Sequence, residues 1–221
     1  MRAIVFVNGQ FEDRDEVAQL LREDDYLVAA DGGALHCLAL GRRPDVVVGD
    51  LDSLDADLVE QLAASGTQIE RHDVAKNQTD LELAIERAIK DGAEEIWLVA
   101  ATGGRLDQSL ANLLLLAQRE WPVKLKVFGN GQLAQVLHSH ERLELHDYIG
   151  ATLSILPLTQ QVTGITYQSM AYPLENATLN FGSTRGISNE IVASPASLEI
   201  ESGMLLVVYE VKRWEDGEGG R

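Results

Sequence analysis

Short apolar runs alternate with helical stripes throughout the first 130 residues, and this alternation constrains the fold more than any other feature. Runs that predict buried strands occupy 3–7, 26–30, 46–48, 67–71, 96–101 and 123–128. Between them, apolar residues recur at helical spacing, as in the helix expected over 79–91. The pattern predicts right-handed β-α-β connections and an α/β domain over residues 1–130, with a doubly wound, mostly parallel sheet.

The pattern changes after about residue 130. Short, partly alternating runs separated by Gly, Pro, Asn and Ser occur at 133–137, 142–145, 152–156, 162–167, 177–180, 198–200 and 204–211. They predict a C-terminal all-β sandwich domain over residues 131–214. The polar, Gly-rich segment 215–221 has nothing to pack, so we expect a disordered tail there.

Composition excludes several classes of function. A formal net charge of −17 argues against a nucleic-acid-binding surface, because phosphate backbones are bound by Lys and Arg. The single cysteine, Cys37, excludes an internal disulfide and a CxxC site, which fits a reducing compartment. The first apolar run is too short for a signal peptide, and no later run approaches a membrane span. We therefore expect a cytoplasmic protein with no membrane partner.

Charged residues follow the apolar runs at positions where ligands bind in doubly wound proteins, beyond the carboxyl ends of the strands. They are Asp31, Asp50, Asp52, Asp80, Arg105 and Asp107. The coincidence of these positions indicates a site at one edge of the sheet.

Asp50 and Asp52 follow the strand predicted over 46–48. If the chain stays extended through the pair, both side chains share a face, and two carboxylates held that close either trap a proton or bind a hard cation such as Mg²⁺. The alternative is that Asp52, Ser53 or Asp55 only caps the helix expected over 56–64.

Asp80 would extend this pair into a cluster able to hold Mg²⁺ on a polyphosphate. It also has a structural alternative as a first-turn acid favoured by the helix dipole, with the Thr79 hydroxyl as the cap.

Two glycine pairs favour an approach of phosphate to the backbone. Gly32 and Gly33 follow Asp31, which is equally well explained as a turn former. Gly103 and Gly104 precede Arg105, whose planar fork suits phosphate oxygens at a helix N-terminus, although an exposed Arg at a helix entry is the alternative. There is neither a Walker A motif nor a GxGxxG after the first predicted strand, which argues against P-loop NTPases and the common dinucleotide binders. Together, the residues indicate a metal-dependent enzyme acting on a nucleotide or polyphosphate.

Five motifs, in order, closely resemble those of thiamine pyrophosphokinases. They are Asp31-Gly32-Gly33-Ala34, Gly49-Asp50-Leu51-Asp52-Ser53, Lys76-Asn77-Gln78-Thr79-Asp80, Gly103-Gly104-Arg105-Leu106-Asp107-Gln108 and Gly186-Ile187-Ser188-Asn189-Glu190. Each motif is weak alone, whereas five in sequence over nearly the whole chain are strong.

The resemblance implies transfer of a pyrophosphoryl group from the co-substrate ATP to thiamine, giving thiamine diphosphate and AMP, in a homodimer with sites shared between subunits. It implies a catalytic set of Asp50, Asp52, Asp80, Arg105 and Asp107, of which Asp50, Asp52 and Asp80 bind Mg²⁺. It implies nucleotide binding by Asp31, Gly32, Gly33, Lys76, Asn77, Thr79, Gly104 and Arg105. It implies thiamine binding by Gln78, Gln108, Ser188 and Asn189.

Two positions depart from the family pattern, and two other functions compete. Asn77 stands where the family more often has Asp, and Gln108 where many bacterial members have His.

The general base is not assigned; Asp80 and Asp107 are candidates. The competing functions are a pyrophosphokinase of similar fold acting on a pterin alcohol and a non-catalytic nucleotide- or thiamine-binding protein.

Overall fold

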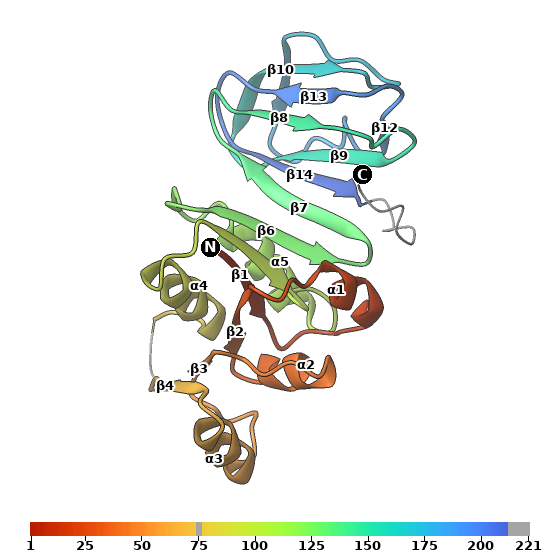
Figure 1. Ribbon diagram of the computed structural model, residues 1–221. Helices are drawn as coiled ribbons and strands as arrows, with labels where there is room; N and C mark the ends of the chain where they lie inside the picture. Colours follow the sequence, from red (N-terminus) through yellow and green to blue (C-terminus); the bar gives the residue numbers. More distant parts are fainter. Residues whose placement is uncertain (74–76, 212–221) are drawn as a thin grey trace. The chain divides into compact units, whose positions relative to one another are not determined.

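The computed structural model describes residues 1–73 and 77–211, and the chain forms two compact units (Figure 1). The first is Met1–Asn130 and the second begins at Gly131. The tail expected at 215–221 lies outside the described residues.

Parallel strands build the sheet of the first unit in the order β6-β5-β1-β2-β3-β4. Their bounds are β1 (Arg2–Phe6), β2 (Tyr26–Ala30), β3 (Val46–Gly49), β4 (Gln68–Arg71), β5 (Glu95–Val99) and β6 (Lys124–Gly129). The predicted parallel sheet is confirmed. The strand order reverses between β1 and β5, so the sheet has its switch point there.

Helices follow the strands and cover both faces of this sheet. They are α1 (Arg14–Leu20), α2 (Gly33–Ala39), α3 (Ala56–Ala64), α4 (Asp80–Lys90) and α5 (Leu106–Leu115). The buried cluster that includes Ala34 of α2 and Val59 of α3 contains Ala29 and Val47 from the strands. Arg87 of α4 donates to Glu70 of β4. Ile69, the neighbour of Glu70, packs against the cluster, and adjacent side chains of a strand point to opposite faces of the sheet. Helix α4 therefore lies on the other face. Helices on both faces make the sheet doubly wound.

Strand β3 is buried throughout, as its sequence predicted. Val46, Val47 and Val48 have no exposed surface, because helices cover both sides of the sheet. Burying side chains of this size stabilises the fold by about 1.5 kcal/mol or more each. The strand therefore gives the residues that follow it a rigid base.

Helix α5 differs from the other helices of this unit. No side chain of α5, all of which the structure describes, is buried. Leu106, Leu110 and Leu114 recur at four-residue spacing and are exposed. Side chains four apart lie on one face of a helix, so they form an apolar stripe.

Antiparallel strands build the described part of the second unit in two sheets, which confirms the expected all-β class. One sheet has the order β12-β9-β14-β7 and the other β11-β10-β13-β8. The bounds are β7 (Gln132–Leu137), β8 (Arg142–Leu145), β9 (Thr152–Pro157), β10 (Gln161–Gln168), β11 (Ala177–Asn180), β12 (Asn189–Glu190), β13 (Ala196–Glu199) and β14 (Leu205–Glu210). The short strand β12 was not expected, because two polar residues carry no alternation that would predict it.

Among the helices of the described residues, none combines the length and apolar character that a transmembrane helix requires.

Candidate active site

Three carboxylates of the first unit lie together beyond the ends of β2 and β3. Asp31, Asp50 and Asp52 each offer an oxygen, and these oxygens lie within 4.8 Å of one another. β2 and β3 pair in parallel, so their carboxyl ends meet at the same edge of the sheet. The sequence placed Asp31 with the nucleotide phosphates, whereas its position puts it beside the other two acids.

A left-handed turn at Leu51 brings Asp50 and Asp52 together. The chain is not extended through the pair, because Leu51 has φ 65°. The Asp52 N–H donates to Asp50 Oδ1 over 3.3 Å, and the Leu51 side chain packs into the core with Leu54. Burial of the two leucines thus fixes a turn that an apolar, non-glycine residue rarely adopts.

Helix capping does not explain these acids. Asp55 occupies the N-cap of α3, but its side chain makes no capping hydrogen bond. The Ser53 hydroxyl donates to Asp52 Oδ1 over 3.2 Å. The acids therefore face one another at the strand end instead of bonding to the start of the helix.

Asp80 reaches the same place from α4. A Cβ added to Gly49 would lie 3.1 Å from the Asp31 Cβ and 3.2 Å from Asp80 Oδ1, so both acids pack closely against this glycine. Thr79 caps the helix as predicted, because its hydroxyl accepts from the Glu82 N–H over 3.2 Å. Asp80 is thus both a first-turn acid and a neighbour of the carboxylate cluster.

Asp31 is the member whose environment most favours a cation. It is 8% exposed, and its Oδ1 has no hydrogen-bond partner among the described residues. A buried carboxylate without a partner is costly, and neighbouring carboxylates raise that cost. An oxygen-only donor set of this kind suits a hard divalent ion such as Mg²⁺.

Gly32 and Gly33 are explained by packing within the chain. A Cβ at Gly33 would lie 2.0 Å from the Phe6 carbonyl oxygen, and one at Gly32 would lie 2.5 Å from the Asn8 side chain. Asn8, which also donates to the Ser53 hydroxyl over 3.5 Å, was missed from sequence. A lone Asn after a strand carries no spacing signal that would have identified it.

Arg105 and Asp107 form an exposed pair at the start of α5. Arg105 Nη2 lies 2.6 Å from Asp107 Oδ2, and Nε lies 3.1 Å from Oδ1. The hydrogen bond from Arg105 lowers the pKa of Asp107, which makes this carboxylate a weaker proton acceptor. Three of the five guanidinium donors are not used by the pair and are available to phosphate oxygens.

The other motif residues are spread over the surface. Asn77, Thr79, Gly104 and Gln108 are exposed and Gln78 is half-buried, while Lys76 lies outside the described residues. Gln78 bonds to Glu86, where it contributes with Arg119 to a lowered pKa of that carboxyl. A small polar cavity of about 90 Å³ lies at the switch point, between Gln10 after β1 and Thr102 and Gly103 after β5.

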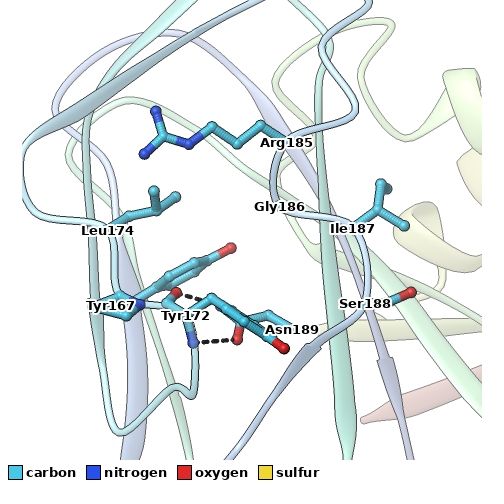
Figure 2. Close-up of a pocket in the computed structure, with 9 residues that line it drawn as sticks. Tyr167, Tyr172, Leu174, Arg185, Gly186, Ile187, Ser188 and Asn189 are labelled. Carbon is cyan, nitrogen blue, oxygen red and sulfur yellow. Dashed lines mark hydrogen bonds between the residues drawn. The ribbon is translucent and has the colours of Figure 1, made fainter.

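The second unit holds a larger pocket of about 360 Å³ (Figure 2). Its lining is mainly aromatic and apolar, from Tyr167, Tyr172, Pro173, Leu174, Arg185, Gly186, Ile187, Ser188 and Asn189. Ser188 and Asn189 were expected from the sequence. Tyr172 and Arg185 were not, because single residues in loops show no periodic pattern.

Comparison with known families covers both units. The sequence model described as thiamin pyrophosphokinase, catalytic domain, matches residues 17–128, and the one described as thiamin pyrophosphokinase, vitamin B1 binding domain, matches residues 139–205. The chain belongs to the thiamine pyrophosphokinase family. It is therefore an enzyme that transfers a pyrophosphoryl group from ATP to thiamine, which is the activity of this family.

Individual relatives agree. Thiamine pyrophosphokinase from Bacillus subtilis is 26% identical over 82% of this chain and 85% of the relative. The crystal structure of the Geobacillus thermodenitrificans thiamin pyrophosphokinase is 27% identical in sequence and has a TM-score of 0.79. The match covers 97% of this chain and 99% of that one. The crystal structure of the Bacillus subtilis enzyme shares the fold, with a TM-score of 0.83 and 24% identity. The match covers 96% of this chain and 100% of that one. Of the two acceptors considered from the sequence, the match to a vitamin B1 binding domain supports thiamine over a pterin alcohol.

Proposed function

We propose that Asp31, Asp50 and Asp52, with Asp80 beside them, hold Mg²⁺ on the polyphosphate of ATP during pyrophosphoryl transfer to thiamine. The observation that carries this proposal is the close approach of three carboxylates, one of which, Asp31, has a buried oxygen without a partner among the described residues. When bound there, Mg²⁺ would supply positive charge to the phosphate oxygens.

The protein groups have separate roles in the proposed reaction. The hydroxyl oxygen of thiamine attacks the β-phosphorus in line and loses its proton to a base, forming one P–O bond while the bond from the β-phosphorus to the α-phosphate oxygen breaks and AMP leaves. Arg105 neutralises charge on the transferred group, and Asp107 holds the guanidinium in place. The lowered pKa of Asp107 makes it a poorer general base.

Substrate binding divides between the units in this proposal. ATP would contact Asp31, Gly104 and Arg105 in the first unit, with Gly32, Gly33, Lys76, Asn77 and Thr79 near its phosphates. Thiamine would occupy the pocket beside Tyr172 and Ser188, with Gln78 and Gln108 contributing from the first unit. The aromatic and apolar lining of the pocket suits a flat heteroaromatic ring.

Asp52→Asn tests the metal assignment. Asp52 is exposed and contributes no core contact, so the variant should fold. We expect its AMP production to fall by on the order of a hundredfold or more, as for loss of one preorganised electrostatic element. Near wild-type turnover in the purified variant, at saturating Mg²⁺, would contradict the assignment.

We also propose a homodimer whose sites are shared between subunits. The exposed leucine stripe of α5 supports it, because this apolar face is available to a second subunit. At thiamine concentrations far below KM, a mixture of inactive Asp52→Asn homodimers and Asn189→Ala homodimers, which keep about a tenth of wild-type activity there, should reach roughly a quarter of wild-type activity, since each mixed dimer then holds one intact site. If mass spectrometry confirms exchange and activity does not return, the site lies within one subunit.

A cytoplasmic location without nucleic-acid partners completes the proposal. The buried thiol of Cys37 fits a reducing compartment, and the charge of −17 disfavours nucleic acid. Fractionation of cells and a filter-binding assay with DNA and RNA would test these two points.

A further inference from the structure

The side chain of Asn189 is occupied by the protein itself. It is 3% exposed, and its Oδ1 accepts from the Tyr172 N–H and the Glu190 N–H, each over 2.9 Å. Its Nδ2 donates to the Tyr172 carbonyl over 2.7 Å (Figure 2). An amide oxygen has two lone pairs, and both are used here. Asn189 therefore has little capacity left for a ligand.

Tyr172 is in the opposite situation. The residue is 71% exposed, although aromatic residues usually bury most of their surface. The residue lies in the loop between β10 and β11 and lines the pocket. Because Asn189 bonds to both the N–H and the carbonyl of Tyr172, the backbone that carries the exposed ring is held on both sides.

Backbone contacts anchor the rest of this loop but not its tip. The Ala171 N–H donates to the Glu190 carbonyl, and the Val192 N–H donates to the Ser169 carbonyl. On the far side, the Tyr167 N–H donates to the Leu174 carbonyl. Between these anchors, the Asn189 side chain accepts from the Tyr172 N–H and donates to the Tyr172 carbonyl. The Asn189 side-chain amide thus supplies hydrogen bonds that a neighbouring strand would otherwise make, at the point where the loop passes the pocket.

Ser188, the neighbouring motif residue, has a different environment. It has φ 58°, and its N–H donates to the Ser154 hydroxyl over 3.0 Å. Figure 2 shows its hydroxyl pointing away from Tyr172, while the Asn189 amide points toward that residue. Two adjacent polar residues of one motif therefore face different partners.

We propose that Asn189 is a positioning residue for the acceptor substrate: it holds the Tyr172 ring as one wall of the pocket and does not itself contact thiamine. This inference rests on the proposed binding of thiamine in this pocket. A ring whose backbone is held in advance loses less freedom when a flat heteroaromatic ligand packs against it, so the two hydrogen bonds to the Tyr172 backbone act on affinity through this residue.

Steady-state kinetics with varied thiamine and saturating ATP test the proposal in four proteins: wild type, Asn189→Ala, Tyr172→Ala and the double variant. Loss of one aromatic contact corresponds to roughly a tenfold change in affinity. We expect each single variant to raise the KM for thiamine by about that factor, with kcat changed far less. Because Asn189 acts through the ring, the double variant should resemble Tyr172→Ala alone.

Independent contributions would overturn the proposal. If Asn189 contacts thiamine directly, the two effects multiply, and the double variant raises KM by roughly a hundredfold. Asn180→Ala is the matched control, because Asn180 bonds to Gln161 and does not line the pocket. Its KM should equal that of the wild type.

A second variant and a second measurement guard against misfolding. Asn189→Asp keeps both acceptor bonds but sets a carboxylate oxygen against the Tyr172 carbonyl, so it should raise KM in the same direction, and circular dichroism would show whether it folds. With Tyr172→Trp as a fluorescent reporter, adding Asn189→Asp should increase acrylamide quenching of the indole; unchanged quenching would refute positioning. If the wild type forms no AMP with thiamine, the proposed function fails, whereas normal wild-type turnover with multiplicative effects refutes only the role of Asn189.

Discussion

Asp31→Asn should stabilise the protein without metal and weaken its response to Mg²⁺. The Asp31 carboxylate is buried beside Asp50 and Asp52, and its Oδ1 has no hydrogen-bond partner among the described residues. Asparagine has the same shape without the charge. Its amide nitrogen can donate to either neighbouring carboxylate, which a carboxylate cannot do.

The magnitude follows from the separation of the charges. Two unit charges at the 4.8 Å limit of this cluster interact by roughly 3.5 kcal/mol at an effective dielectric constant of about 20. Asp50 is half-buried and Asp52 exposed, so solvent screens much of the repulsion. We expect a net gain of about 1 kcal/mol, which raises Tm by roughly 2–4 °C in a protein of this size.

Thermal unfolding in EDTA and in increasing Mg²⁺ measures both effects. Wild type should gain stability with Mg²⁺, by about 2.7 kcal/mol at a hundred times Kd, and Asp31→Asn should gain much less. Asp25→Asn is the matched control, because Asp25 is equally buried but lies 2.6 Å from Arg2 in an ion pair. That variant should lose roughly 3 kcal/mol.

Two results would refute this reasoning. A lower Tm for Asp31→Asn than for wild type in EDTA would mean that the carboxylate is satisfied in the folded protein. An undiminished rise in Tm with Mg²⁺ would mean that Asp31 is not near the cation.

Four further predictions concern stability and reactivity. Burial raises the pKa of the Cys37 thiol to about 12, so native protein should resist iodoacetamide, and Cys37→Ser should keep its activity in a thiamine-dependent AMP assay. Gly33→Ala should lower the free energy of unfolding in urea by about 2–3 kcal/mol, because its Cβ would clash with a carbonyl oxygen 2.0 Å away. Burial acts to raise the pKa of Glu70, but hydrogen bonds from Arg87 and His72 bring it below its ordinary 4.5. The stability that this carboxylate contributes is present above pH 4.5 and is lost as the pH falls through the lower pKa of the folded state. Arg87→Met should therefore reduce the loss of stability in acid unfolding curves. Tyr167→Phe should raise the free energy of unfolding in urea by about 1 kcal/mol, because it removes a buried hydroxyl that has no partner among the described residues.

Much of the fold followed from the sequence, because the same pattern controls burial and secondary structure. Tyr26–Ala30, Ala56–Ala64 and Arg142–Leu145 have the bounds that their periodicity predicts. Helix α5 was predicted from its leucines, but their exposure was not, because periodicity identifies an apolar face without identifying what covers it. The short β12 was missed because its pairing with β9 is decided by tertiary contacts.

The candidate site was predictable in its position but not in its internal arrangement. The sheet order brings the ends of β2 and β3 together, so acids after both strands had to be neighbours. The left-handed turn at Leu51 could not be foreseen, because a leucine does not signal positive φ. It is the burial of that side chain in the core, a tertiary effect, that turns Asp52 back toward Asp50.

Asp31 and Asn189 show why residue type alone does not assign a role. Both are buried polar residues in family motifs, and from the sequence each was expected to contact a substrate. Asn189 has hydrogen-bond partners within the protein on both its oxygen and its nitrogen, whereas Asp31 retains an oxygen without a partner among the described residues. A buried group that is satisfied by the protein stabilises a loop, and a buried charge that is not satisfied needs a ligand. This difference in partners is why we propose positioning for Asn189 and cation binding for Asp31. Thermal unfolding in EDTA tests both proposals, because Asn189→Ala should be destabilising and Asp31→Asn stabilising.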